Sequence, residues 1–137
     1  MKRNMQPGGA STRPGFTLIE LLIVVVIIGI LASVAMAKYG KVREAAFLST
    51  LKSDIELLAK HQEIYHLHHL QYGDEANLTD FEASPGVNVD IGYAAGDGWG
   101  GSATHSALPG VTCGILVGNA TAGSGGPATV RDVLTCN

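Results

Sequence analysis

One carboxylate, Glu20, stands at the start of the most apolar stretch of the chain. Residues Leu21 to Ala37 are apolar apart from Ser33, and Gly29 lies within them. A lone carboxylate in such surroundings is costly unless a cation meets it, so an intramembrane charge usually marks a functional site. The alternative is an acid at a helix N-terminus, stabilised by the helix macrodipole, which would suit a simple anchor equally. Glu20 is therefore the first candidate functional residue.

Two cysteines, Cys113 and Cys136, provide the second candidate chemistry. Two cysteines in an exported chain most often form a disulfide, whereas in a reducing compartment they remain free thiols. The export features described below favour the disulfide. Pairing would close a loop of roughly 24 residues and stabilise the fold by about 3 kcal/mol in the chain-entropy model.

Histidines gather where an amphipathic pattern ends, at His61, His66, His68 and His69. Such a cluster can bind a metal, but no matching set of carboxylates or cysteines accompanies it. A solvated helix C-terminus, where cationic histidine is favourable, is the preferred interpretation. No spacing suggests a nucleophile elbow or a paired-acid site either, so we expect no enzymatic activity, metal or cofactor.

The charge of the chain is divided by position. The formal net charge is −3, yet Lys2, Arg3 and Arg13 all precede Phe16, and without them six basic residues face 12 acidic ones. The chain from Phe16 onward is therefore acidic. This argues against nucleic acid as the main partner, because phosphate binding needs a basic surface.

The apolar stretch sets the first element. Together with residues 16–20 it supplies about 22 residues, enough to cross a bilayer as a helix. Basic residues follow it at Lys38, Lys41 and Arg43. The positive-inside count is nearly balanced between the two flanks, and the acidic remainder favours an orientation with the N-terminus inside and the domain outside.

An amphipathic pattern begins at Tyr39. Its apolar stripe consists of Leu48, Leu51, Ile55, Leu58 and Tyr65, with Gln62 as a polar interruption. Charged residues, Asp54 among them, lie mostly off this stripe. Because no proline occurs between Gly15 and Ser84, we predict one continuous helix from about Phe16 to about Leu70.

The remainder predicts a small sheet. A connecting loop spans 71–86, strand-like runs follow at 87–93, 99–107 and 111–117, and a Gly/Ser/Ala loop at 120–128 precedes a short tail segment. Trp99 is expected in the core between sheet and helix. The fold class is therefore α+β, with the long helix packed on a three- or four-stranded antiparallel meander.

The hexapeptide Gly15-Phe16-Thr17-Leu18-Ile19-Glu20, followed by the apolar run through Ala32, resembles the precursor signal of type IV pilins and related pseudopilins. The resemblance covers the N-terminal third closely and the rest only in layout. One departure is Ala37, which stands where the family usually has a kinking proline, so a bend there is left open. The Phe16 start favours the common type IVa subclass.

The resemblance implies a processing and assembly pathway. A prepilin peptidase would cut between Gly15 and Phe16, and the new Phe16 amine would be N-methylated. Glu20 of one subunit would then meet the Phe16 amine of its neighbour in a helical homo-oligomeric filament. Assembly would proceed from the bacterial inner membrane, through the pilus assembly machinery there, to the cell surface.

These expectations divide the chain into a leader (1–15), a membrane-spanning or filament-core helix (16–38), an amphipathic helix half (39–70) and a globular region (71–137). The implied function is that of a pilus subunit acting in adhesion, twitching motility or DNA uptake. The alternatives are a type II secretion pseudopilin and a minor or non-polymerising anchored domain. Major pseudopilins tend to carry an acidic calcium-binding loop near the C-terminus, where this chain has only Asp132 and a cysteine pair, which favours the pilin.

Overall fold

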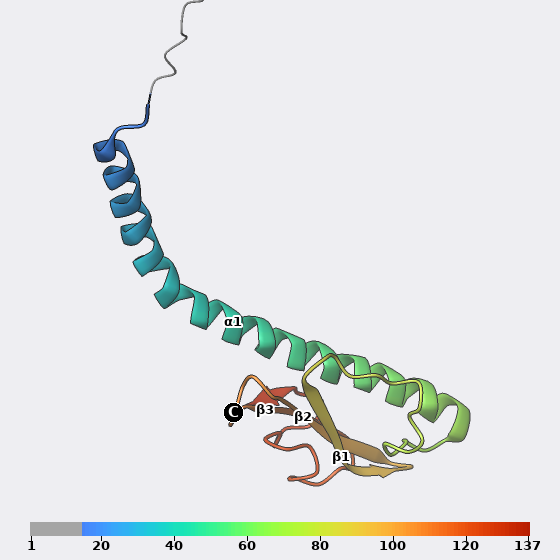
Figure 1. The fold of residues 1–137 in the computed structure, drawn as a ribbon. Helices are drawn as coiled ribbons and strands as arrows, with labels where there is room; N and C mark the ends of the chain where they lie inside the picture. The colour runs from blue at the N-terminus through green and yellow to red at the C-terminus, as the bar shows by residue number, and fades with distance from the viewer. Residues whose placement is uncertain (1–14) are drawn as a thin grey trace, which may run out of the picture. The chain divides into compact units, whose positions relative to one another are not determined.

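A computed structural model describes residues 15–137. The chain divides into two compact units, Met1–Tyr39 and Gly40–Asn137. Helix α1, Leu18–His69, belongs to both (Figure 1). Of the predicted leader, 1–15, only Gly15 falls among the described residues.

Helix α1 confirms the prediction of one long helix and begins and ends within two residues of the expected bounds. It continues through Ala37, the position at which the resembled family usually has a proline. At its C-terminus Leu70 takes a left-handed conformation, with φ 57°, and its N–H donates to His66 O at 2.8 Å. This position usually holds glycine, because a side chain is strained there.

The second unit contains a four-stranded antiparallel sheet in the order β1-β2-β3-β4, as predicted. The strands are β1 Val87–Ala95, β2 Gly98–His105, β3 Thr112–Gly118 and β4 Thr135–Cys136. Strand β2 ends earlier than expected because His105 Nδ1 accepts a hydrogen bond from the Ala107 N–H at 2.9 Å, which turns the chain.

The main core lies between the sheet and the part of α1 that runs along one of its faces (Figure 1). Leu51, Ile55 and Leu58 of the predicted stripe are fully buried. Trp99 packs against Leu58 and is also fully buried, as expected. Burying one such aliphatic side chain stabilises a fold by about 1.5–3 kcal/mol, so the stripe holds the helix on the sheet.

Two polar side chains of α1 are buried as well, and they hold the loop that follows the helix. Gln62 donates from Nε2 to Gly73 O at 2.6 Å and accepts from the Gly73 N–H at 2.8 Å. The Asp54 carboxylate accepts from the Ser84 N–H at 2.9 Å and from Ser84 Oγ at 2.8 Å. The expectation that Asp54 lies off the buried stripe is wrong, because the loop runs back along the helix and covers that flank.

Replacing Gln62 by leucine is expected to lower the free energy of unfolding by about 3 kcal/mol, because the buried N–H and C=O of Gly73 would both lose their partner. The measurement is thermal unfolding of the detergent-solubilised protein, followed by the fluorescence of its single tryptophan. Gln71→Leu, at an exposed position, is the matched control and should change little. Equal midpoints for the two variants would contradict a pinning role for Gln62.

The Gly/Ser/Ala loop crosses the opposite face of the sheet. We call residues 120–128 the strap. Ala120 and Ala128 of the strap form a second small core with Leu116, and Tyr93 packs on it. A Cβ at Gly100 would lie 2.6 Å from Ser124 Oγ, and one at Gly114 would fall on Gly125 O. The outward-facing glycines of the sheet therefore let the strap lie backbone on backbone, which the sequence did not reveal.

The predicted disulfide joins Cys113 to Cys136, which face each other across β3 and β4. With a sequence separation of 23 it closes the loop that contains the strap. The double change Cys113→Ala and Cys136→Ala is expected to cost about 3 kcal/mol of unfolding free energy. Urea unfolding with and without reductant measures this. A wild-type protein that reductant does not destabilise would contradict the assignment of this stabilising role.

Candidate functional site

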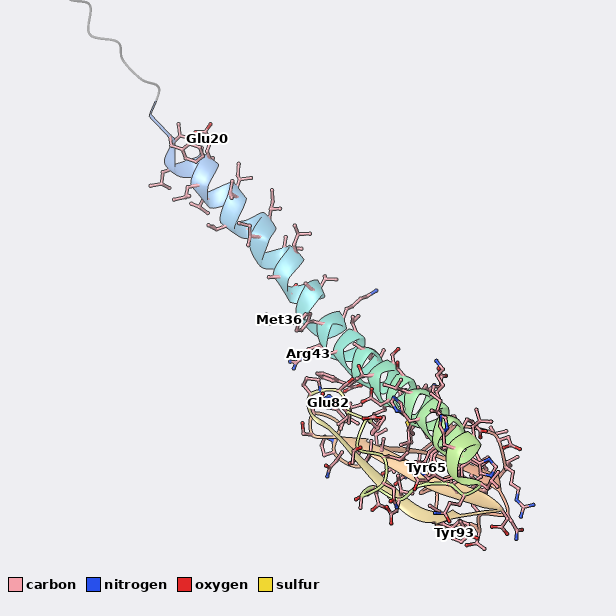
Figure 2. The ribbon with its side chains drawn as sticks, turned by 90° about the vertical axis from the view of Figure 1, so that its right-hand side faces the viewer. Glu20, Met36, Arg43, Tyr65, Glu82 and Tyr93 are labelled. Atoms are coloured by element: carbon pink, nitrogen blue, oxygen red, sulfur yellow. A yellow bond between two sulfur atoms is a disulfide. The ribbon has the colours of Figure 1, made fainter. Side chains whose placement is uncertain are left out.

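The helical segment of the first unit presents a largely apolar, exposed surface to its surroundings. Its helix contains an 18-residue window of mean hydropathy 3.0 with none of it buried, so it is long and apolar enough to cross a membrane. Side chains project from all sides of this segment (Figure 2). Among residues 15–37 only Glu20 carries a charged side chain, so a charged side-chain contact made through this surface involves Glu20.

Glu20 lies in the first turn of α1 (Figure 2). It closes a capping box with Thr17. Glu20 Oε2 accepts from the Thr17 N–H at 2.8 Å and from Thr17 Oγ1 at 2.7 Å, while the Glu20 N–H donates to Thr17 Oγ1 at 3.3 Å. This reciprocal arrangement satisfies N–H groups that a helix start leaves without partners. The spacing of Thr17 and Glu20 in the sequence is a signal for such a helix start, although no capping box was predicted from it.

The capping box leaves one carboxylate oxygen of Glu20 available to a second partner. Both hydrogen bonds that Glu20 accepts end on Oε2, so Oε1 can accept from a further donor. The carboxylate is thus oriented by its own helix in the isolated subunit. The helix-terminus interpretation of Glu20 is therefore correct as a local description, and it is compatible with an intermolecular role.

Gly15 and Phe16 precede the helix. Both are exposed and neither is in a regular element. Phe16 is 74% exposed, and a Cβ at Gly15 would meet nothing within 4 Å. The peptide bond between them is therefore open to an enzyme that binds extended backbone.

The four clustered histidines are arranged by aromatic packing. The rings of Tyr65 and His69 stack at 4.0 Å, and His66 stacks on Tyr72 at 4.4 Å. The ring of His61 meets Phe81 edge-on. Within residues 15–137 no group of three His, Cys, Asp or Glu side chains is placed to hold a metal ion. Two of the four, His61 and His66, contact the loop that follows the helix, through Phe81 and Tyr72.

A polar network at the β1–β2 hairpin was not foreseen. Asp97 accepts from Tyr93 Oη at 3.0 Å and from Asn119 Nδ2 at 2.9 Å. The Asn119 hydrogen bond, followed by that from Tyr93, holds the pKa of Asp97 below its ordinary value, and the bond to Asp97 raises the pKa of Tyr93. This network joins the β1–β2 hairpin to Asn119, the residue that precedes the strap.

Comparison with known proteins bears on the first unit most directly. The family model described as the prokaryotic N-terminal methylation motif matches residues 11–36. The chain is also 38% identical over 85 residues to the type IV major pilin protein PilA of Myxococcus xanthus (strain DK1622). That match covers 61% of this chain and 39% of the relative, so the chain spans about two fifths of the length of the curated relative it matches.

The motif match covers the Gly15–Phe16 junction, the capping box and most of the apolar helix. The fold agrees, since the long N-terminal helix packs its second part on a four-stranded antiparallel sheet closed by the Cys113–Cys136 disulfide. The chain therefore carries the prokaryotic N-terminal methylation motif at residues 11–36 and is similar, over 61% of its length, to a type IV major pilin.

Proposed function

We propose that this chain is a structural subunit of an extracellular type IV pilus filament. One observation carries the proposal. The apolar part of α1, up to residue 37, is exposed rather than buried, and its one charged side chain, Glu20, is held in the first turn. Such a helix is stable in lipid, where it satisfies its own backbone. Outside the membrane it needs cover from other apolar surface, and identical helices of further subunits would provide it.

Processing and assembly are linked through Phe16. Cleavage between Gly15 and Phe16 by a prepilin peptidase would create an amine beside the start of α1, and this amine would then be methylated. Glu20 of a neighbouring subunit, with Oε1 available, would accept a hydrogen bond from it. A buried carboxylate and ammonium stabilise each other only when paired, so this contact would fix the position of each incoming subunit.

The same pathway assigns a role to each segment. Residues 1–15 are the leader, 16–38 the membrane-spanning and later filament-core helix, and 39–70 the part that carries the domain. Residues 71–137 form the outer surface, where the specificity of the fibre would reside. The precursor would reside in the inner membrane and meet the assembly machinery there.

The test is to shear surface material from cells that produce the chain and to examine it by immuno-electron microscopy. Filaments labelled along their length by antibody to the globular unit are expected, and a deletion strain should lack them. Labelled material that stays in the membrane fraction, with no filaments in either strain, would contradict the proposal. A deletion that stops protein secretion but leaves surface filaments intact would favour the pseudopilin alternative instead.

A further inference from the structure

A groove of about 960 Å³ lies along the first part of α1 in the second unit. It is lined by residues 41–52 of α1, by the turn between β2 and β3, and by the C-terminal residues. Ala45 and Leu48 are among its apolar lining residues. We call this surface the proximal groove, because it begins at Lys41, four residues beyond the end of the apolar run at Ala37.

The α1 side of the proximal groove continues a stripe that combines lysines with apolar residues. The stripe consists of Lys38, Lys41, Ala45, Leu48 and Lys52. Spacings of three and four residues place these side chains on one face of a helix, and all three lysines are exposed. A lysine in such a place packs its aliphatic stem on apolar surface and keeps its ammonium in polar surroundings. The stripe therefore suits a boundary between apolar and anionic surroundings.

Acidic side chains are scarce beside this stripe. Of the described residues that line the proximal groove, Glu44 alone has an acidic side chain, against two lysines. The loop that carries Glu82 is held by Asp54 through Ser84. Asp54 lies about 200° around the helix from Lys52, at 3.6 residues per turn, so that loop follows the other flank of α1. The side chains of the proximal groove thus carry a net positive charge.

The near end of the proximal groove lies within reach of lipid headgroups. Because α1 is one continuous helix, Lys41 is about 6 Å further along it than Ala37, at 1.5 Å per residue. The headgroup layer on each side of the hydrocarbon core is about 5–8 Å thick. When residues 16–37 span a bilayer, the start of the groove therefore stands in that layer.

The β2–β3 turn lies at the same end of the groove. Trp99, early in β2, packs on Leu58. Six residues later, His105 stacks on Phe47 with ring centroids 4.4 Å apart, so β2 runs back along α1 toward the start of the second unit. The turn continues in that direction and lines the groove as far as Pro109, which is exposed.

We propose that, before assembly, the proximal groove holds the headgroup of an anionic phospholipid. The inference rests on the membrane stage of the proposed function and adds the chemical class of the partner at the membrane surface. The ammonium of Lys41 meets the lipid phosphate, and the apolar floor beside Ala45 meets the glycerol backbone. Basic residues next to a membrane span attract anionic lipids in this way. Charge complementarity and the continuity of α1 from the span into the groove select this occupant.

Thiol accessibility in vesicles tests this contact. The full chain with Pro109→Cys is reconstituted in phosphatidylcholine vesicles with or without phosphatidylglycerol, and an uncharged, water-soluble maleimide is added. We expect phosphatidylglycerol to slow the reaction about fivefold, which is the effect of one basic residue near an anionic surface. High salt should restore the rate. Ala76→Cys, at an exposed position in the loop after α1, is the matched control and should react equally in both kinds of vesicle.

Two charge variants assign the effect to the groove. Lys41→Gln in the Pro109→Cys chain should abolish the slowing, whereas Lys60→Gln, also exposed but outside the groove, should retain it. Equal rates in the two kinds of vesicle, or slowing that persists with Lys41→Gln, refute the inference. Slowing in both kinds of vesicle that grows with the protein-to-lipid ratio also refutes it, because a second copy then covers the groove.

These outcomes are separate from those that test the proposed function, because no filament is needed in the vesicles. Protection of Pro109→Cys together with a lack of surface filaments on cells would refute the proposed function alone. Filaments on cells without protection in vesicles would refute the lipid contact alone.

Discussion

Replacing Glu20 by glutamine is expected to reduce surface filaments at least tenfold while the protein still accumulates in the membrane. Glutamine can complete a capping box as glutamate does, so the local structure with Thr17 is retained. What glutamine lacks is the negative charge, and a buried amine without a charged partner is strongly destabilising. Quantitative immunoblots of sheared and membrane fractions measure the effect.

The converse change separates capping from charge. Thr17→Val removes the capping oxygen and leaves the Glu20 carboxylate, so helix stability should fall by about 1 kcal/mol and filaments should persist. Glu82→Leu, which removes an exposed carboxylate of the second unit, should have no effect. If Glu20→Gln assembled normally and Thr17→Val did not, Glu20 would act only through its own helix.

Replacing Gly114 by alanine is the second substitution expected to have a large effect, and it lowers the stability of the fold. The new Cβ would coincide with the carbonyl oxygen of Gly125, so the strap would have to leave the sheet. Leu116 and Ala128, now buried, would be partly exposed. Overpacking of this kind costs about 3 kcal/mol, and with it the protein should become sensitive to protease within the strap.

A matched glycine provides the control. A Cβ at Gly96 would meet only Leu70 O, at 3.6 Å, which is an ordinary contact. Gly96→Ala should therefore unfold at nearly the wild-type temperature, monitored by Trp99 fluorescence. If both alanine variants were equally stable, the close packing of the strap on β3 would be contradicted.

The elements built from local patterns were predictable from the sequence. The long helix follows from a continuous apolar run, an amphipathic stripe and the absence of proline, and the strands follow from alternation between turn residues. Leu51, Ile55 and Leu58 are buried as their spacing predicts. The disulfide followed from two cysteines and a signal for export.

Contacts between distant segments were not predictable. The burial of Asp54 depends on Ser84, 30 residues away, and that of Gln62 on Gly73. The strap lies on the sheet because glycines in three strands lack side chains where it crosses, and glycine content alone predicts only a loop. The proposed site could be named from the sequence for the opposite reason, since Phe16 and Glu20 lie within five residues of each other.

The most direct test of the central claim is the intact mass and N-terminal sequence of the subunit in sheared filaments. The mature chain is expected to begin at Phe16, to carry one N-terminal methyl group and to retain the Cys113–Cys136 disulfide. A subunit that begins at any other residue, or a full-length chain with its leader inside the filament, would contradict it.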